Sequence, residues 1–128
     1  MKVVALIARI LLGLMFLVFG SNTFLNFIKM GQLPGGTAGQ YMGALFASHH
    51  FYVVGALMVI SGILLLVNRF VPLALIFLGP ILVNILLYHL LMQQPGIGMG
   101  VFATLLWFLV FWRRRAAFSG VFQARTAD

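Results

Sequence analysis

The chain contains 128 residues, of which 63% are hydrophobic and only 7% are charged, and its mean hydropathy is +1.14. These values exclude a soluble domain, because a soluble fold of this length needs a charged surface, and they predict an integral membrane protein. The sequence has no cysteine, which excludes disulfides, thiolate metal sites and CxxC redox chemistry, and its single acidic residue is Asp128.

Four apolar segments are predicted to form membrane-spanning helices. They cover residues 3–27, 51–67, 71–92 and 97–112, and a short tail at 113–128 is predicted to be loosely ordered after Phe118. About 20 apolar residues cross a hydrocarbon core of about 30 Å, so the second and fourth segments are short. Trp107, Trp112 and the arginines at 113–115 can anchor the fourth segment at the interface. The sequence therefore predicts one all-α domain over residues 1–128, an integral membrane four-helix bundle.

In the first segment, the apolar run is interrupted by Arg9 and continues to Phe27 without an AxA-like cleavage site. This pattern favours an uncleaved signal anchor over a secretory signal peptide. Arg9 shares one helical stripe with Gly13, Phe16 and Gly20. Because no acidic residue can pair with it, Arg9 is expected to face protein and to bond carbonyls, asparagine, water or lipid phosphate. The alternative is that its side chain only extends to the interface.

Glycines recur at regular spacing in the first two segments. Gly13 and Gly20 are seven residues apart, and so are Gly55 and Gly62. Each pair lies nearly in line along its helix. Small residues let helix backbones approach closely, so this spacing predicts tight helix packing.

The connection at residues 28–50 is the only one long enough to hold structure of its own. It opens with the turn residues GQLPGG, after which Ala38, Tyr41, Met42 and Leu45 recur at helical spacing. This stripe predicts a short amphipathic helix on the outer face of the bundle. The alternative is an irregular loop whose apolar residues touch lipid.

The positive charges indicate the orientation of the chain in the membrane. The connections after the first and the third segment hold only one basic residue, Lys29. The two ends of the chain and the connection between the second and third segments hold Lys2, Arg69, Arg113 to Arg115 and Arg125. By the positive-inside rule we expect a multi-pass protein of the bacterial inner membrane with both termini in the cytoplasm. The net charge of +7 then indicates contact with anionic lipid. Nucleic acid is not an expected partner, because aromatic and basic residues do not interleave.

The third segment, GPILVNILLYHLLMQQPG, sets Asn84, Tyr88 and His89 among aliphatic residues. At about 1.5 Å per residue from Pro72, Asn84 lies about 18 Å and His89 about 26 Å above the inner surface. Side chains of other segments reach a similar depth, so an outer polar cluster is predicted from Asn22, Asn26, His49, His50, Asn84, Tyr88 and His89. Amide and imidazole groups suit the carbonyl oxygens of a quinone in an apolar cleft. The structural alternative is that Asn84 bonds a neighbouring helix or a carbonyl freed by Pro80, with the histidines and Tyr88 as interfacial or loop residues.

Three stretches resemble the DoxX family of small four-helix bacterial membrane proteins. They are ARILLGLMFLVFG at 8–20, AGQYMGALFAS at 38–48 and NRFVPLALIFLGPILVNILLYHL at 68–90. The resemblance spans nearly the whole chain in the same order, but Asn22 and Thr23 stand where family members often carry a lysine. It implies a role beside a membrane redox system, since some members are subunits of a thiosulfate-to-quinone oxidoreductase or accompany a membrane redox complex.

The first functional expectation is therefore a non-catalytic subunit or partner of a quinone-linked redox system, with the lipid bilayer, an oxidoreductase subunit and a second copy of the chain as expected partners. Autonomous catalysis is not expected, because the serines lack a base at motif spacing and no GxSxG occurs. No metal site is predicted and no cofactor other than a bound quinone, because the histidines lack helical ligand spacing and an orienting carboxylate. A small lipophile or solute carrier and a structural protein without ligand remain the alternatives.

Overall fold

The computed structural model describes residues 2–26, 35–94 and 96–126. All regular elements in these residues are helical: α1 (Lys2–Leu25), α2 (Gly36–Ala47), α3 (His50–Val67), α4 (Val71–Leu91), α5 (Ile97–Arg113) and the 3-10 helix η1 (Arg115–Phe122). The all-α class is confirmed. The ends of the four long helices lie within two residues of the predicted segment bounds. Lys29 and most of the predicted GQLPGG turn lie outside the described residues.

Three of these helices, α1, α3 and α4, are long and apolar enough to cross a membrane. A fourth span results only if α5 and η1 are taken together, and these two helices are bent by 86° at their junction. The composition of the helices thus supports a multi-pass membrane protein with three spans or up to four.

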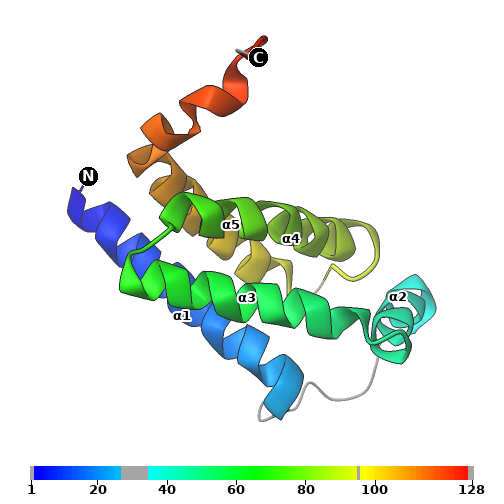
Figure 1. The fold of residues 1–128 in the computed structure, drawn as a ribbon. Coiled ribbons are helices and arrows are strands. Elements are labelled where there is room, and N and C mark those ends of the chain that lie inside the picture. The colour runs from blue at the N-terminus through cyan, green and yellow to red at the C-terminus, as the bar shows by residue number, and fades with distance from the viewer. Residues whose placement is uncertain (1, 27–34, 95, 127–128) are drawn as a thin grey trace.

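The four long helices form a closed ring of neighbours, in which α1 and α4 each pack against both α3 and α5. The short helix α2 contacts α3 at one end of this group, and the N-terminus and the start of η1 lie at the other end (Figure 1). We call these the α2 end and the arginine end, since the latter holds Lys2, Arg9, Arg69, Arg113 and Arg114.

The core consists of aliphatic side chains from all four long helices, among them Leu12, Leu65, Leu75, Leu78, Leu106 and Val110. Side-chain hydrogen bonds tie two pairs of helices across it: the indole Nε1 of Trp107 donates to the carbonyl of Leu75 at 3.0 Å and ties α5 to α4, and Nη1 of Arg9 donates to the carbonyl of Leu65 and ties α1 to α3. The rest of the core is held by apolar packing.

The contact between α1 and α3 is made through glycine. A methyl group on Gly62 would lie 2.7 Å from the backbone nitrogen of Leu17 and 2.8 Å from the carbonyl oxygen of Gly13. A methyl group on Gly20 would lie 2.9 Å from the carbonyl oxygen of Gly55. Because these neighbours are backbone atoms, which cannot move aside, the four glycines allow the two helices to touch directly.

The helix predicted in the first connection is present as α2, so an irregular loop is excluded over Gly36–Ala47. Ala38 is buried, and Tyr41, Met42 and Leu45 are half-buried. The predicted apolar stripe is therefore the side of α2 that packs against the rest of the protein.

The tail differs from the prediction of loose order after Phe118. Residues Arg115–Phe122 form η1, and the ring of Phe118 is buried, with its centroid 5.0 Å from that of Phe111. The apolar ring of Phe118 docks η1 on the bundle, which outweighs the polar character of the residues that follow it.

Candidate functional site

Arg9 is a buried cation at the arginine end, with only 9% of its surface exposed. Its Nη1 donates to the carbonyl of Leu65 and, at 3.5 Å, to that of Leu66. Both carbonyls belong to the last turn of α3, and that of Leu65 also accepts the Asn68 N–H at 3.3 Å. Nε and Nη2 of Arg9 donate to no atom of the described residues. Arg9 thus faces the protein interior and retains free donors.

A cavity of about 440 Å³ lies beside Arg9, between the start of α1, the α3–α4 turn and the end of α5. Part of its wall is apolar and includes Leu6 and Val110. The remainder is basic or polar: Lys2, Arg9, Asn68, Arg113 and Arg114. The guanidinium Nη2 of Arg114 donates to Oδ1 of Asn68 at 2.6 Å and fixes that side chain beside the turn.

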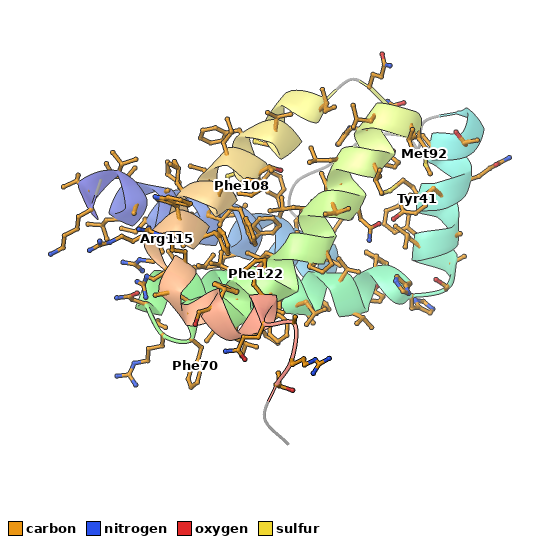
Figure 2. All side chains as sticks on the ribbon, turned by 90° about the horizontal axis from the view of Figure 1, so that it is seen from above. Tyr41, Phe70, Met92, Phe108, Arg115 and Phe122 are labelled. Carbon is orange, nitrogen blue, oxygen red and sulfur yellow. The ribbon has the colours of Figure 1, made fainter. Side chains whose placement is uncertain are left out.

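At the opposite end of the molecule, α2 meets α4 through a pair of tyrosines. The ring centroids of Tyr41 and Tyr88 are 5.5 Å apart, and Figure 2 shows Tyr41 on the side of α2 that faces α4. The His89 ring stands edge-on to Tyr88, with centroids 5.1 Å apart. Tyr88 therefore contacts two rings, that of its predicted neighbour His89 and that of Tyr41 from α2.

The imidazole of His89 is engaged with the protein backbone. Its Nδ1 lies 2.9 Å from the carbonyl oxygen of Gln93. Because a carbonyl oxygen only accepts, Nδ1 carries the proton, and Nε2 is the nitrogen left for another partner. The ring also lies against Gly96, whose φ is +91°, since a methyl group there would sit 3.3 Å from Cε1 of His89. His89 thus stabilises the connection between α4 and α5.

Asn84 does not join this aromatic group. It is exposed on α4, one turn after the exposed Pro80, and its side chain has no hydrogen-bond partner among the described residues. The structural alternative, a bond from Asn84 to a neighbouring helix or to a carbonyl freed by Pro80, is therefore not found among the described residues. The amide lies on the outer side of the helix because its turn of α4 buries Ile81 and Leu82 instead.

The two adjacent histidines of the predicted cluster lie apart from Tyr88 and His89, at the start of α3. His49 is exposed in a left-handed conformation, and its ring stacks on Tyr52 with centroids 5.7 Å apart. His50 is exposed, and its backbone N–H donates to the Ser48 hydroxyl at 3.3 Å. Asn22 is half-buried on α1, two residues before Phe24, which stacks on the same Tyr52 at 5.5 Å.

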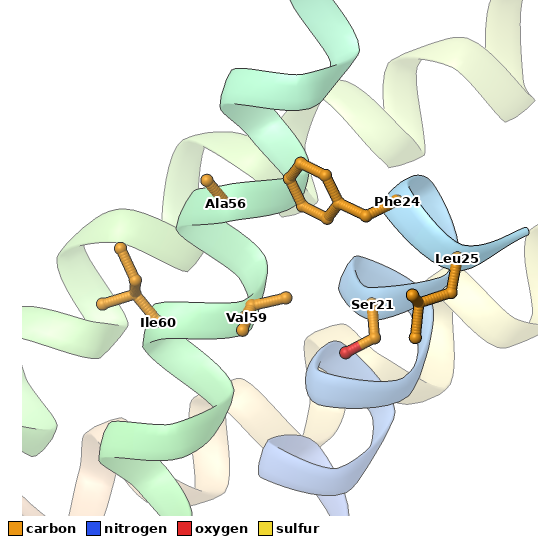
Figure 3. A pocket seen from close by; sticks show the side chains of 6 residues that line it. All are labelled: Ser21, Phe24, Leu25, Ala56, Val59 and Ile60. Carbon is orange, nitrogen blue, oxygen red and sulfur yellow. The ribbon is translucent and has the colours of Figure 1, made fainter.

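A second hollow of about 310 Å³ lies between α1 and α3 near this aromatic stack. Figure 3 shows the side chains that line it: Ser21, Phe24, Leu25, Ala56, Val59 and Ile60. Phe24 is shared between this groove and the stack on Tyr52. The groove is almost entirely apolar, and the Ser21 hydroxyl is its one side-chain hydrogen-bonding group.

Ser21, Phe24 and Asn68 were not singled out by sequence reasoning. The cavities depend on which side chains of neighbouring helices come together, and the spacing of residues along the sequence does not predict those pairs. The signal for Asn68 was its place in the tight turn before Phe70, where both residues have positive φ. Within the described residues, no three histidine, cysteine or acidic side chains form a group suited to a metal ion.

No family model, no curated protein and no solved structure matches this chain.

Proposed function

We propose that this chain is a multi-pass protein of the bacterial inner membrane, a four-helix bundle that acts as a non-catalytic subunit or partner of a quinone-linked redox system. The apolar helices support the membrane part of this proposal. The DoxX resemblance of residues 8–20, 38–48 and 68–90 supports the redox part.

The groove between α1 and α3 is the observation that carries the ligand-binding part. A quinone has a flat apolar ring with carbonyl oxygens and a long apolar tail, so its site needs apolar walls, an aromatic surface and few donors. The groove provides the walls, the Phe24 ring and the Ser21 hydroxyl. Its lining residues are half-buried or exposed, which leaves the tail of a bound molecule free to extend into lipid.

This assignment moves the proposed quinone site away from Asn84 and His89. Asn84 is on the outer side of α4, and Nδ1 of His89 is occupied by the Gln93 carbonyl. His49 of the outer cluster does not line the groove but is linked to it by ring contacts, because it stacks on Tyr52 and Tyr52 stacks on Phe24.

A pair of substitutions on α3 tests the groove. Ala56→Phe adds a phenyl ring within the groove, whereas Val53→Phe adds it at a position that is 62% exposed and outside the lining. A short-tailed ubiquinone analogue should raise the unfolding temperature of the detergent-purified protein and of Val53→Phe, but not that of Ala56→Phe. Absence of any quinone-dependent shift in the unsubstituted protein would refute the proposal.

The orientation has its own test, because the chain has no cysteine of its own. We expect Gly36→Cys, at the α2 end, to react with a membrane-impermeant maleimide added to intact spheroplasts, and Ser119→Cys, in η1, to react only after lysis. The reverse pattern would place the arginine end outside and contradict the positive-inside assignment.

A further inference from the structure

The cavity at the arginine end concentrates positive charge that no acidic side chain of the described residues offsets. Four cations line it: Lys2, Arg9, Arg113 and Arg114. The single acidic side chain, Asp128, lies outside the described residues. Like charges gathered around one partly apolar hollow repel one another, and an anion placed among them relieves that repulsion.

Several N–H donors in the cavity have no acceptor among the described residues. Arg9 makes its protein bonds through Nη1 alone, and Arg113 has no side-chain hydrogen bond among the described residues. A guanidinium offers five N–H groups in a planar fork, which matches the oxygens of a phosphate. Arg9 is held in place by the last turn of α3, so its free donors are fixed before any ligand arrives.

The walls of the cavity restrict the kind of anion. Leu6 and Val110 and other apolar side chains share the lining with the cations. A small inorganic anion would leave that apolar part unfilled, whereas a phosphate ester with an organic portion would contact both parts.

We propose that this cavity binds the phosphate group of a phosphate ester, with Arg9 and Arg113 as its main donors. The ester can be the headgroup of an anionic phospholipid or a soluble phosphate ester, since both present the same group. This site is independent of the quinone groove, which lies at the other end of α1 and α3.

The test measures the unfolding temperature of the detergent-purified protein as a function of added ligand, which gives an apparent Kd. The probes are phosphatidylglycerol, phosphatidylcholine and glycerol 1-phosphate. Stabilisation by phosphatidylglycerol but not by glycerol 1-phosphate identifies a lipid site, and stabilisation by both identifies a site for soluble esters. The proposal is overturned if none of the three probes stabilises the protein. It is also overturned if phosphatidylcholine and phosphatidylglycerol stabilise the protein equally and glycerol 1-phosphate does not.

Three substitutions locate the effect. Arg113→Gln should weaken the apparent Kd by about fivefold, the value of one basic charge near an anionic group. Arg9→Gln should weaken it by about tenfold or more, because a charged hydrogen bond is lost. Arg69→Gln removes the same charge from an exposed residue of the same end that does not line the cavity, and should change Kd by less than about twofold. Equal losses for Arg69→Gln and Arg113→Gln would reduce the effect to general charge attraction and overturn the assigned site, even if Arg9→Gln failed to fold.

Discussion

The α1–α3 contact and the polar side of α4 both place unusual residues in apolar helices, with opposite results. At the α1–α3 contact, the glycines and the buried Arg9 lie where another helix touches them, and Gly13, Gly20, Gly62 and Arg9 each lie against backbone atoms of that helix. On α4, Asn84 is exposed and has no hydrogen-bond partner among the described residues, and the His89 ring bonds the Gln93 carbonyl in the connection to α5.

The difference shows what decides the direction of a residue in an apolar helix. A glycine on α1 or α3 faces the neighbouring helix, because the lack of a side chain on that side lets the two backbones come into contact. Asn84 shares its turn of α4 with Ile81 and Leu82, which fill the inner side. A polar residue among aliphatic ones therefore does not mark the inner side by itself. The four predictions below would strengthen or remove this contrast.

The largest effect is expected at the α1–α3 contact. Gly62→Ala should lower the stability of the protein by about 1–3 kcal/mol, since the added methyl group meets the backbone of α1 at 2.7 and 2.8 Å. The unfolding temperature in detergent measures the loss. Gly98→Ala is the matched control, because nothing lies within 4 Å of a methyl group at that position of α5. Similar values for both variants would remove close packing as the role of Gly62.

An effect of about the same size is expected at the buried cation. Arg9→Leu should reduce stability by about 1.5–3 kcal/mol, because two carbonyls in the last turn of α3 lose a charged donor. Lys2→Leu removes an exposed charge from the same helix and serves as the comparison in the same unfolding experiment. If the two variants were equally stable, the bonds to Leu65 and Leu66 would contribute nothing measurable.

A smaller and local effect is expected on α4. His89→Phe keeps a ring against Gly96 but loses the bond to the Gln93 carbonyl, which should cost about 1 kcal/mol. Amide hydrogen exchange at Gly96 and Ile97 should become faster. His50→Phe, which replaces an exposed side chain without a hydrogen bond or ring contact in the described residues, should leave exchange there unchanged. Unchanged exchange in His89→Phe would mean that His89 does not hold the connection.

The smallest effect is expected at Asn84. Asn84→Leu should leave the unfolding temperature unchanged or raise it slightly, because the amide has no partner among the described residues and leucine suits an apolar surface. The quinone-dependent shift should also remain, since Asn84 does not line the groove. A clear loss of stability would show that Asn84 bonds a second copy of the chain or another partner.

The sequence was sufficient to predict the helices, because hydrophobic runs and turn residues are local signals. The stripe of Ala38, Tyr41, Met42 and Leu45 predicted α2 and the side on which it packs. The helical wheel also placed Arg9 with Gly13 and Gly20, and all three are buried on one side of α1.

The candidate site was less predictable, because it depends on neighbours in space. Depth along the membrane grouped Asn84 with His49 and His89, but residues at one depth can point in different directions around the bundle. The glycine spacing predicted that the first two segments pack tightly, but it does not predict which side chains border the groove at Ser21 and Ala56, where α1 and α3 separate.

The right-angled turn after α5 has a consequence for the surrounding lipid. The helix α5 has 17 residues, or about 25 Å at 1.5 Å per residue, and the chain then bends by 86° into η1, so the tail cannot lengthen it. In the proposed membrane orientation this leaves α5 about 5 Å shorter than a hydrocarbon core of about 30 Å, while α1 is long enough. The resulting hydrophobic mismatch on one side of the protein should thin the bilayer there and favour lipids with shorter acyl chains.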